Sequence, residues 1–206
     1  MLNTNINNVV TLEGTVVRGA EYSHEIYGES FYTVLLQVKR DSGTDDVLPV
    51  LISDRLCSEE LRHGTILFVR GEYRSYNKHT ENSNKLILSV FAREIEINRT
   101  EKCNNLNEAV FTGYICKPPV YRKTPLGREI ADIMFVVNRS YGKSDYIPLI
   151  CWGRNARFIS ELKVGKKLQI WGRIQSREYV KKLYKTESEV RTAYEVSVSR
   201  LELTEE

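Results

Sequence analysis

The chain has 206 residues, of which 41% are hydrophobic and 28% charged, and its formal net charge is +3. That composition is typical of a globular protein with one large core or two small ones. No apolar run is long enough to span a membrane and the first residues lack a signal-peptide pattern, so we expect a cytoplasmic protein. The four cysteines show no CxxC spacing and the three histidines lie far apart, so we expect no metal site and no cofactor.

The first half of the chain predicts five strands. Alternating apolar residues place them at 8–18, 30–40, 46–53, 65–75 and 85–97, with a short helix near 56–62. Five strands with a helix between the third and the fourth is the pattern of a small Greek-key barrel, the OB-fold. A polar stretch, 98–107, follows and is typical of a linker.

The second half repeats the first at an offset of 99 residues. Asn8–Val17 resembles Asn107–Cys116, Ser30–Arg40 falls on Glu129–Arg139, and Asp45–Arg55 falls on Ser144–Arg154. After two inserted residues the glycines also match, Gly64 with Gly165 and Gly71 with Gly172. Because these matches keep their order along the whole length, we predict an all-β chain with short helices. It would form two tandem five-stranded OB-fold barrels, residues 1–104 and 105–206.

Residues 144–179 predict a strand, a short helix and a second strand. In the first strand Ile147, Leu149 and Cys151 share one face, whereas Tyr146 and Trp152 share the other. A helix is predicted over Asn155–Leu162, and Gly165 ends it. The second strand begins at Lys167 and has one apolar face. Its other face is aromatic and polar, with Trp171, Arg173, Gln175, Arg177 and Tyr179. Aromatic rings interleaved with guanidinium groups are suited to stacking bases and pairing phosphates.

The second half resembles the bacterial single-stranded DNA-binding protein family over nearly all of Asn107–Leu203. The motifs that carry the resemblance are TP-x-G at Thr124–Gly127, VNR at Val137–Arg139, WGR-x-A at Trp152–Ala156 and GRIQSR-x-Y at Gly172–Tyr179. The resemblance implies base stacking at four positions, here Tyr141, Tyr146, Trp152 and Tyr179. The first half has Ser42, Val47 and Ser53 at the first three of these positions, and the fourth falls near Tyr76 or Lys78. Family members usually end in an acidic tail that recruits other proteins, whereas this chain ends in LELTEE, so the resemblance does not imply recruitment through such a tail.

Basic and aromatic residues of the second half complete the predicted DNA-binding site. A loop between the first two strands carries Tyr121, Arg122, Lys123 and Arg128, for which a solvated basic loop is the alternative. A loop before the last strand, 177–191, interleaves tyrosines with lysines. The predicted DNA-binding residues are Tyr121, Arg122, Lys123, Arg128, Arg139, Tyr141, Tyr146, Trp152, Arg154, Arg173, Gln175, Arg177, Tyr179, Lys181, Lys182 and Tyr184.

The distribution of charge favours the second half as the main site. Residues 1–105 carry twelve basic and fifteen acidic side chains, whereas the remainder carries eighteen basic and twelve acidic ones. In the first half Arg70, Tyr73, Arg74 and Tyr76 could form a weaker site or be solvated strand ends. For Trp171, packing or a dimer contact is as good an interpretation as nucleic acid.

The pattern therefore predicts a non-catalytic protein that binds single-stranded DNA with little sequence preference, in replication, recombination or repair. The resemblance implies a bacterial, plasmid or phage source and four OB-folds in an assembly, which a homodimer of this chain would supply. An alternative is a primosome or mobile-element accessory protein that acts mainly through protein contacts. A metal nuclease is a more distant alternative, because Asp132 and Asp145 have no carboxylate cluster around them in the sequence.

Overall fold

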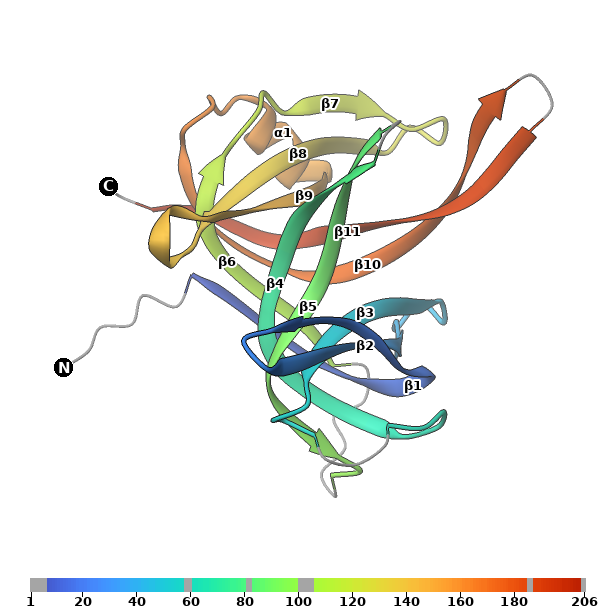
Figure 1. Ribbon diagram of the computed structural model, residues 1–206. Helices are drawn as coiled ribbons and strands as arrows, with labels where there is room; N and C mark the ends of the chain where they lie inside the picture. Colours follow the sequence, from blue (N-terminus) through green and yellow to red (C-terminus); the bar gives the residue numbers. More distant parts are fainter. Residues whose placement is uncertain (1–6, 58–60, 81–82, 100–105, 185–186, 205–206) are drawn as a thin grey trace.

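The computed structural model describes residues 7–57, 61–80, 83–99, 106–184 and 187–204 (Figure 1). Within these ranges the chain forms two barrels, one above the other in Figure 1. Most strands alternate between buried and accessible residues because one face of each strand packs into a barrel and the other faces outward. The polar stretch that is predicted as a linker, 98–107, lies largely outside the described residues.

The first barrel closes through five strands, whose strand pairs run β1–β2, β2–β3, β3–β5, β5–β4 and β4–β1. The pairing of β3 with β5 is parallel and the others are antiparallel, which is the arrangement of an OB-fold. The five strands are β1 Asn8–Ile26, β2 Glu29–Lys39, β3 Asp45–Ser53, β4 Ile66–Thr80 and β5 Ser83–Ile97.

The second barrel closes in the same order, with one additional strand, one 3-10 helix and one α-helix. Its strand pairs are β6–β8, β8–β9, β9–β11, β11–β10 and β10–β6, and β7 pairs along the outer edge of β8. The elements are β6 Asn107–Ile115, β7 Val120–Lys123, β8 Glu129–Asn138, the 3-10 helix Ser140–Gly142, β9 Ser144–Trp152, α1 Gly153–Ser160, β10 Lys167–Tyr184 and β11 Glu187–Leu203. The prediction of two tandem OB-folds is therefore confirmed.

Two local predictions are wrong. The described residues around the helix expected near 56–62 are not helical: 54–56 form a turn, 57, 61 and 62 have no regular structure, and 58–60 lie outside the described residues. The loop expected at 177–191 is a hairpin of β10 and β11, which pair from Leu168 to Tyr184. Tyr179, Val180 and Val190 in that segment are residue types that favour strands, and antiparallel pairing satisfies its backbone groups.

The repeated glycines lie where strands of one barrel approach each other most closely. A Cβ atom on Gly14 would be 2.3 Å from the carbonyl oxygen of Gln37, and one on Gly113 would be 2.2 Å from that of Val136. Since no side chain fits at such distances, both barrels need glycine there. Gly64 and Gly165 have positive φ angles of 91° and 87°, which an L side chain rarely adopts.

The two barrels are joined by antiparallel pairing of β1 with β6, in which Val10 lies opposite Ala109. These two residues are equivalent positions of the internal repeat, because their numbers differ by its offset of 99. Pairing of equivalent positions in antiparallel strands relates the two barrels by an approximate two-fold axis. Equivalent asparagines fix the barrels next to the joint: Asn8 exchanges two hydrogen bonds with the backbone of Tyr73, and Asn107 does the same with Ile174.

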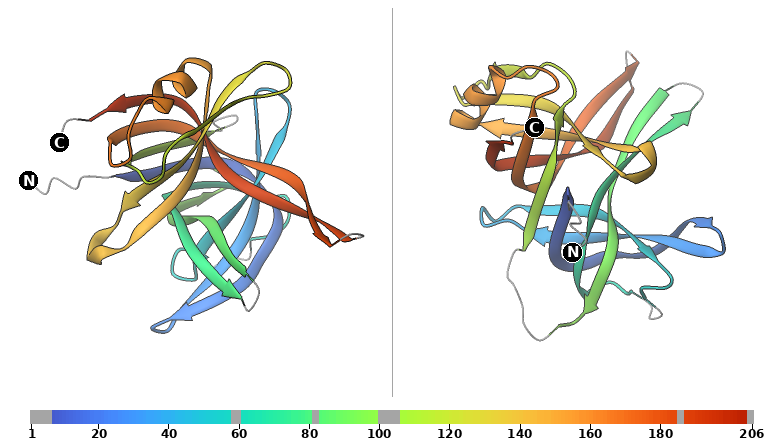
Figure 2. Two further views of the ribbon diagram at one scale, coloured as in Figure 1. Left: turned by 90° about the horizontal axis from the view of Figure 1, so that it is seen from above. Right: turned by 90° about the vertical axis from the view of Figure 1, so that its left-hand side faces the viewer.

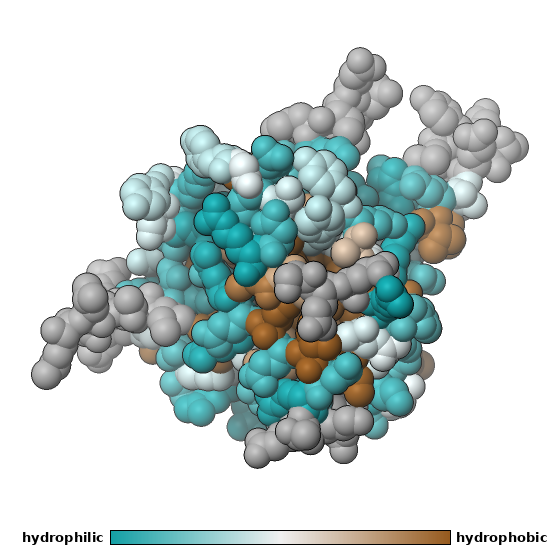
Figure 3. All heavy atoms as spheres, turned by 60° about the horizontal axis from the view of Figure 1, so that its bottom comes forward, coloured by the Kyte–Doolittle hydropathy of each residue, from teal (hydrophilic) through white to brown (hydrophobic). Residues whose placement is uncertain are grey.

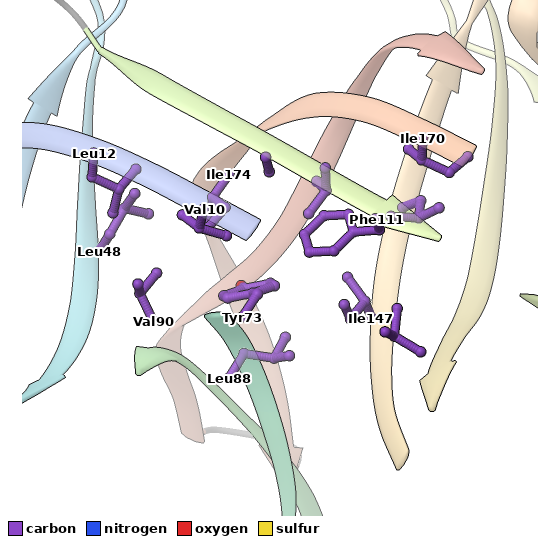
Figure 4. Packing of buried hydrophobic residues seen from close by; sticks show 14 of the residues in the cluster. Val10, Leu12, Leu48, Tyr73, Leu88, Val90, Phe111, Ile147, Ile170 and Ile174 are labelled. Atoms are coloured by element: carbon purple, nitrogen blue, oxygen red, sulfur yellow. The ribbon is translucent and has the colours of Figure 1, made fainter. Parts of the chain in front are cut away.

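Apolar packing continues from one barrel into the other. The buried residues form one hydrophobic cluster, and Tyr73 from the first barrel packs against Phe111 from the second with ring centroids 6.4 Å apart (Figure 4). On the lower face of the molecule, apolar residues gather near the centre and polar residues surround them (Figure 3). The continuous packing indicates that the two barrels stabilise each other.

Candidate nucleic-acid interface

Strand β9 presents two aromatic side chains on its outer face. Ile147, Leu149 and Cys151 point into the barrel and are buried, whereas Tyr146 and Trp152 remain 40% and 39% exposed. The alternation of the strand imposes this division, as the sequence indicates. A half-exposed aromatic ring held on a rigid strand provides a flat apolar surface at little conformational cost, which is what a base needs for stacking.

Basic side chains lie next to Trp152. A hollow of about 580 Å³ is lined by Lys123, Arg128 and Trp152, together with Gly127, Glu129 and Gly153. The structure brings them together because the segment expected as a loop includes β7, which pairs with β8 from Val120 to Lys123. Within the described residues neither Lys123 nor Arg128 forms an ion pair, so both charges are available to a phosphate.

The neighbouring residues of β7 are already occupied by carboxylates. The hydroxyl group of Tyr121 donates a hydrogen bond to Glu129 at 2.6 Å, which raises the pKa of Tyr121. The Nε atom of Arg122 donates to Asp132 at 2.8 Å, and this hydrogen bond raises the pKa of Arg122. Both residues are exposed, so they line the surface although their polar groups have protein partners.

Tyr141 stands in the solvent at the tight turn before β9. Its side chain is 99% exposed and its φ angle is +61°, in the left-handed region, and Gly142 follows with a φ angle of +68°. The turn is closed by a hydrogen bond from the amide of Arg139 to the carbonyl group of Lys143, 2.8 Å long. The ring is therefore free of packing contacts that would compete with a base.

Three predicted DNA-binding residues lie instead at the joint between the barrels. Arg139 forms an ion pair with the buried carboxylate of Asp145 at 3.2 Å. Arg173 approaches the buried carboxylate of Asp46 at 3.4 Å. Gln175 is 8% exposed and donates a hydrogen bond to Glu195. Their role as DNA contacts stays a prediction, and in the structure their polar groups already have partners within the protein.

Asp46 and Asp145 occupy equivalent places in two matching clusters. Asp46 in β3 accepts hydrogen bonds from Arg40 at 2.7 Å and from the amide of Ser176 at 2.6 Å, in the other barrel. The hydroxyl group of Ser176 in turn accepts a hydrogen bond from the amide of Val47.

The second cluster repeats these contacts from the other side. Asp145 in β9 accepts a hydrogen bond from the amide of Ser75 at 2.7 Å and pairs with Arg74 at 3.2 Å, and the amide of Tyr146 donates to the Ser75 hydroxyl at 2.7 Å. Burial raises the pKa of Asp145, and the Ser75 amide and the two arginines oppose that rise. Each barrel thus holds a hairpin of the other against its own outer face.

The remaining predicted residues lie on α1 and on the β10–β11 hairpin. Arg154 is exposed at the start of α1. Arg177 lies over the ring of Tyr179, 6.0 Å from its centroid. Tyr179 and Lys181 line a groove against the first barrel, away from the hollow beside Trp152. Lys182 and Tyr184 belong to β10, but their side chains lie outside what the structure describes.

The first barrel also contributes residues to that groove, and the sequence indicates only one of them, Tyr76. Of the four residues considered for a weaker site, Tyr73 is buried in the core and Arg74 pairs with Asp145, whereas Tyr76 is 57% exposed and lines the groove. His24 and Lys85 also line it and were not singled out. The burial of Tyr73 could be predicted from the two-residue period of β4, because Gly71, Tyr73 and Ser75 all face inward.

Comparisons with known proteins agree with this architecture. Residues 106–204 match the model of the single-strand binding protein family. The match covers the second barrel, which is therefore similar to that family. Single-stranded DNA-binding protein 3 of Clostridium acetobutylicum is 32% identical over 81 residues, which cover 36% of this chain and 56% of that protein. Single-stranded DNA-binding protein 1 of Staphylococcus aureus is 33% identical over 81 residues, covering 36% and 48%. The chain thus spans about half the length of the curated relatives it matches.

A solved structure has a similar fold over nearly the whole chain. The crystal structure of the wild-type single-stranded DNA binding protein from Thermus aquaticus superposes with a TM-score of 0.73 and 23% identity. The superposition covers 97% of this chain and 93% of that one, so the likeness of fold includes the first barrel. Within the described ranges, no group of three or more His, Cys, Asp and Glu residues could hold a metal ion, and no helix is long and apolar enough to cross a membrane.

Proposed function

We propose that the chain binds single-stranded DNA without catalysis and with little preference for sequence. The observation that carries this proposal is the outer face of the second barrel, where Tyr146 and Trp152 stand half exposed on a rigid strand beside Lys123 and Arg128. Aromatic rings stack on any base, and cations replace the counterions of any phosphate, so such a surface has no means of reading sequence. The family of the second barrel and the names of its relatives support the proposal.

The consequence in the cell follows from mass action. A protein that binds only the unpaired form shifts hairpins and breathing duplexes toward single strands and shields the strands it covers. Such a role fits replication, recombination or repair, in which single strands are exposed.

Binding to an oligothymidylate should be much tighter than binding to a duplex of the same length. The logarithm of the affinity should fall linearly with the logarithm of salt concentration, with a slope of about −0.7 for each phosphate contacted. Anisotropy of a labelled strand measures both quantities, and the strand should be recovered uncut after incubation with Mg²⁺. Equal affinity for the duplex, or an affinity that salt leaves unchanged, would contradict the proposal.

We further propose that two chains associate and so bring four barrels together. The outer face of the joined sheet supports this, because Trp171, Val110 and Val9 lie side by side across β10, β6 and β1 and remain partly accessible. Arg200 covers the Trp171 ring at 4.8 Å. Light scattering should give a mass near twice the 23.9 kDa of one chain. The mass of a single chain at every concentration would refute the dimer.

A further inference from the structure

The start of strand β9 is held by the first barrel. The β4–β5 hairpin rises from the first barrel to the second (Figure 2), and β4 contacts β9 there. The hydroxyl group of Ser75 in β4 accepts a hydrogen bond from the amide of Tyr146 at 2.7 Å. Since the pairing of β9 with β11 begins at Leu149, this hydroxyl group takes the place of a strand partner at the start of β9.

A buried carboxylate completes the contact between the two strands. Asp145 is fully buried, accepts a hydrogen bond from the amide of Ser75 at 2.7 Å, and pairs with Arg74 at 3.2 Å. Two neighbouring residues of β9, Asp145 and Tyr146, are thus both bonded to Ser75. Because breaking a buried hydrogen bond leaves its donor without a partner, β9 cannot shift along β4 without a loss of stability.

The same contact fixes the backbone of a residue that we propose to stack on bases. The amide of Tyr146 is bonded to Ser75, whereas its ring remains 40% exposed on the outer face of β9. A ring that is already held in place loses less conformational freedom when a base stacks on it, so it binds more tightly. Trp152 lies at the other end of β9, opposite Ile130 of β8. The first barrel therefore fixes the ring at one end of this face.

The equivalent cluster on the other side of the joint is attached to no ring. There the amide of Val47 donates a hydrogen bond to the hydroxyl group of Ser176 at 3.1 Å, and Asp46 accepts one from the amide of Ser176 at 2.6 Å. Val47 and Tyr146 are equivalent positions of the internal repeat. Both clusters join the barrels, and of the two only that of Asp145 is bonded to an aromatic residue of an outer face.

We propose that Ser75, held by Asp145 and Arg74, is a positioning residue for the binding of single-stranded DNA. It fixes the backbone of Tyr146 and thereby the orientation of the ring on which a base stacks. The inference rests on the proposed function and extends it, because the first barrel then influences binding through a residue that touches no DNA. Ser75 is buried and acts through Tyr146.

A double-mutant cycle separates positioning from a general loss of stability. Ser75→Ala removes one hydroxyl group, and it should weaken oligothymidylate binding by about threefold or more in the parent chain and in a Trp152→Ala chain. In a Tyr146→Ala chain the same change should alter the affinity by less than about 1.5-fold, because the ring that it positions is already absent. The anisotropy of a labelled strand gives all of these affinities.

Ser176→Ala is the matched control, because it removes the same group from the equivalent cluster. It should lower the melting temperature about as much as Ser75→Ala does and leave the affinity for the strand unchanged. Should Ser75→Ala not fold, the same cycle is measured with Arg74→Gln, which weakens the hold on Asp145 and keeps the Ser75 hydroxyl group.

The possible results are distinguishable. Equal losses of affinity in the parent, Trp152→Ala and Tyr146→Ala chains would overturn the inference, and so would a loss in Ser176→Ala as large as that in Ser75→Ala. An affinity that Ser75→Ala leaves unchanged would overturn it as well. In each of these cases the parent binds the strand, so the proposed function still stands. If the parent binds no strand, the proposed function fails and the inference fails with it.

Discussion

Replacing Asp46 by alanine is expected to lower the free energy of unfolding by about 3–5 kcal/mol. The carboxylate is fully buried and accepts hydrogen bonds from Arg40 and from the amide of Ser176. Without it, Arg40, Arg173 and the Ser176 amide lose their carboxylate partner at the joint. Removing one member of a buried ion pair costs more stability than the intact pair contributes, because the remaining charge is left uncompensated. Urea denaturation followed by circular dichroism measures the change.

Asp132→Ala is the matched control for that variant. Asp132 also pairs with an arginine, at 2.8 Å, but its side chain is 40% exposed and that of Arg122 is 52% exposed. Exposed ion pairs contribute at most about 1 kcal/mol, so the control should be nearly as stable as the parent. If Asp46→Ala lost no more stability than Asp132→Ala, the buried cluster would not be what holds the barrels together.

Removing both rings from the outer face of β9 should have the largest effect on binding. Tyr146→Ala with Trp152→Ala is expected to weaken oligothymidylate binding by at least about thirtyfold, since each base stack contributes about 1–3 kcal/mol. Neither side chain belongs to the buried hydrophobic cluster, so truncation removes no residue of the core. The affinity is read from the anisotropy of a labelled strand.

Tyr27→Ala provides the comparison for the loss of an exposed ring. Tyr27 lies at the turn between β1 and β2, is fully exposed, and lines neither the Trp152 hollow nor the groove. Its removal should leave the affinity unchanged. A double β9 variant that bound within about threefold of the parent would show that stacking at this face does not carry binding.

The strands and barrels could be predicted from the sequence because their signals are local. The alternation of side chains along β9 places Tyr146 and Trp152 on its outer face. The repeated glycines mark the points where two strands of a barrel lie closest together. The partners of buried carboxylates could not be predicted in this way. Asp145 pairs with Arg139 of its own barrel, whereas Arg74 and Ser75 reach it from the other barrel only because β1 pairs with β6.

The same long-range pairing decides where Tyr179 lies. The family resemblance implies base stacking on Tyr179 as well as on Tyr141, Tyr146 and Trp152. In the structure the hairpin that carries Tyr179 crosses to the first barrel, so the four aromatic residues do not line a single hollow. Which barrel a long hairpin packs against depends on the orientation of the two barrels, and no local pattern encodes that orientation.

The tryptophan fluorescence of a Trp171→Phe chain, titrated with oligothymidylate, tests the central claim most directly. Trp171 lies on the outer face of the joined sheet, and its replacement leaves Trp152 as the only tryptophan of the sequence. If bases stack on Trp152, its emission should be quenched in a saturable way, and a duplex of the same length should leave it nearly unchanged. Saturated binding of the strand, seen by anisotropy, with no change in Trp152 emission would contradict the account.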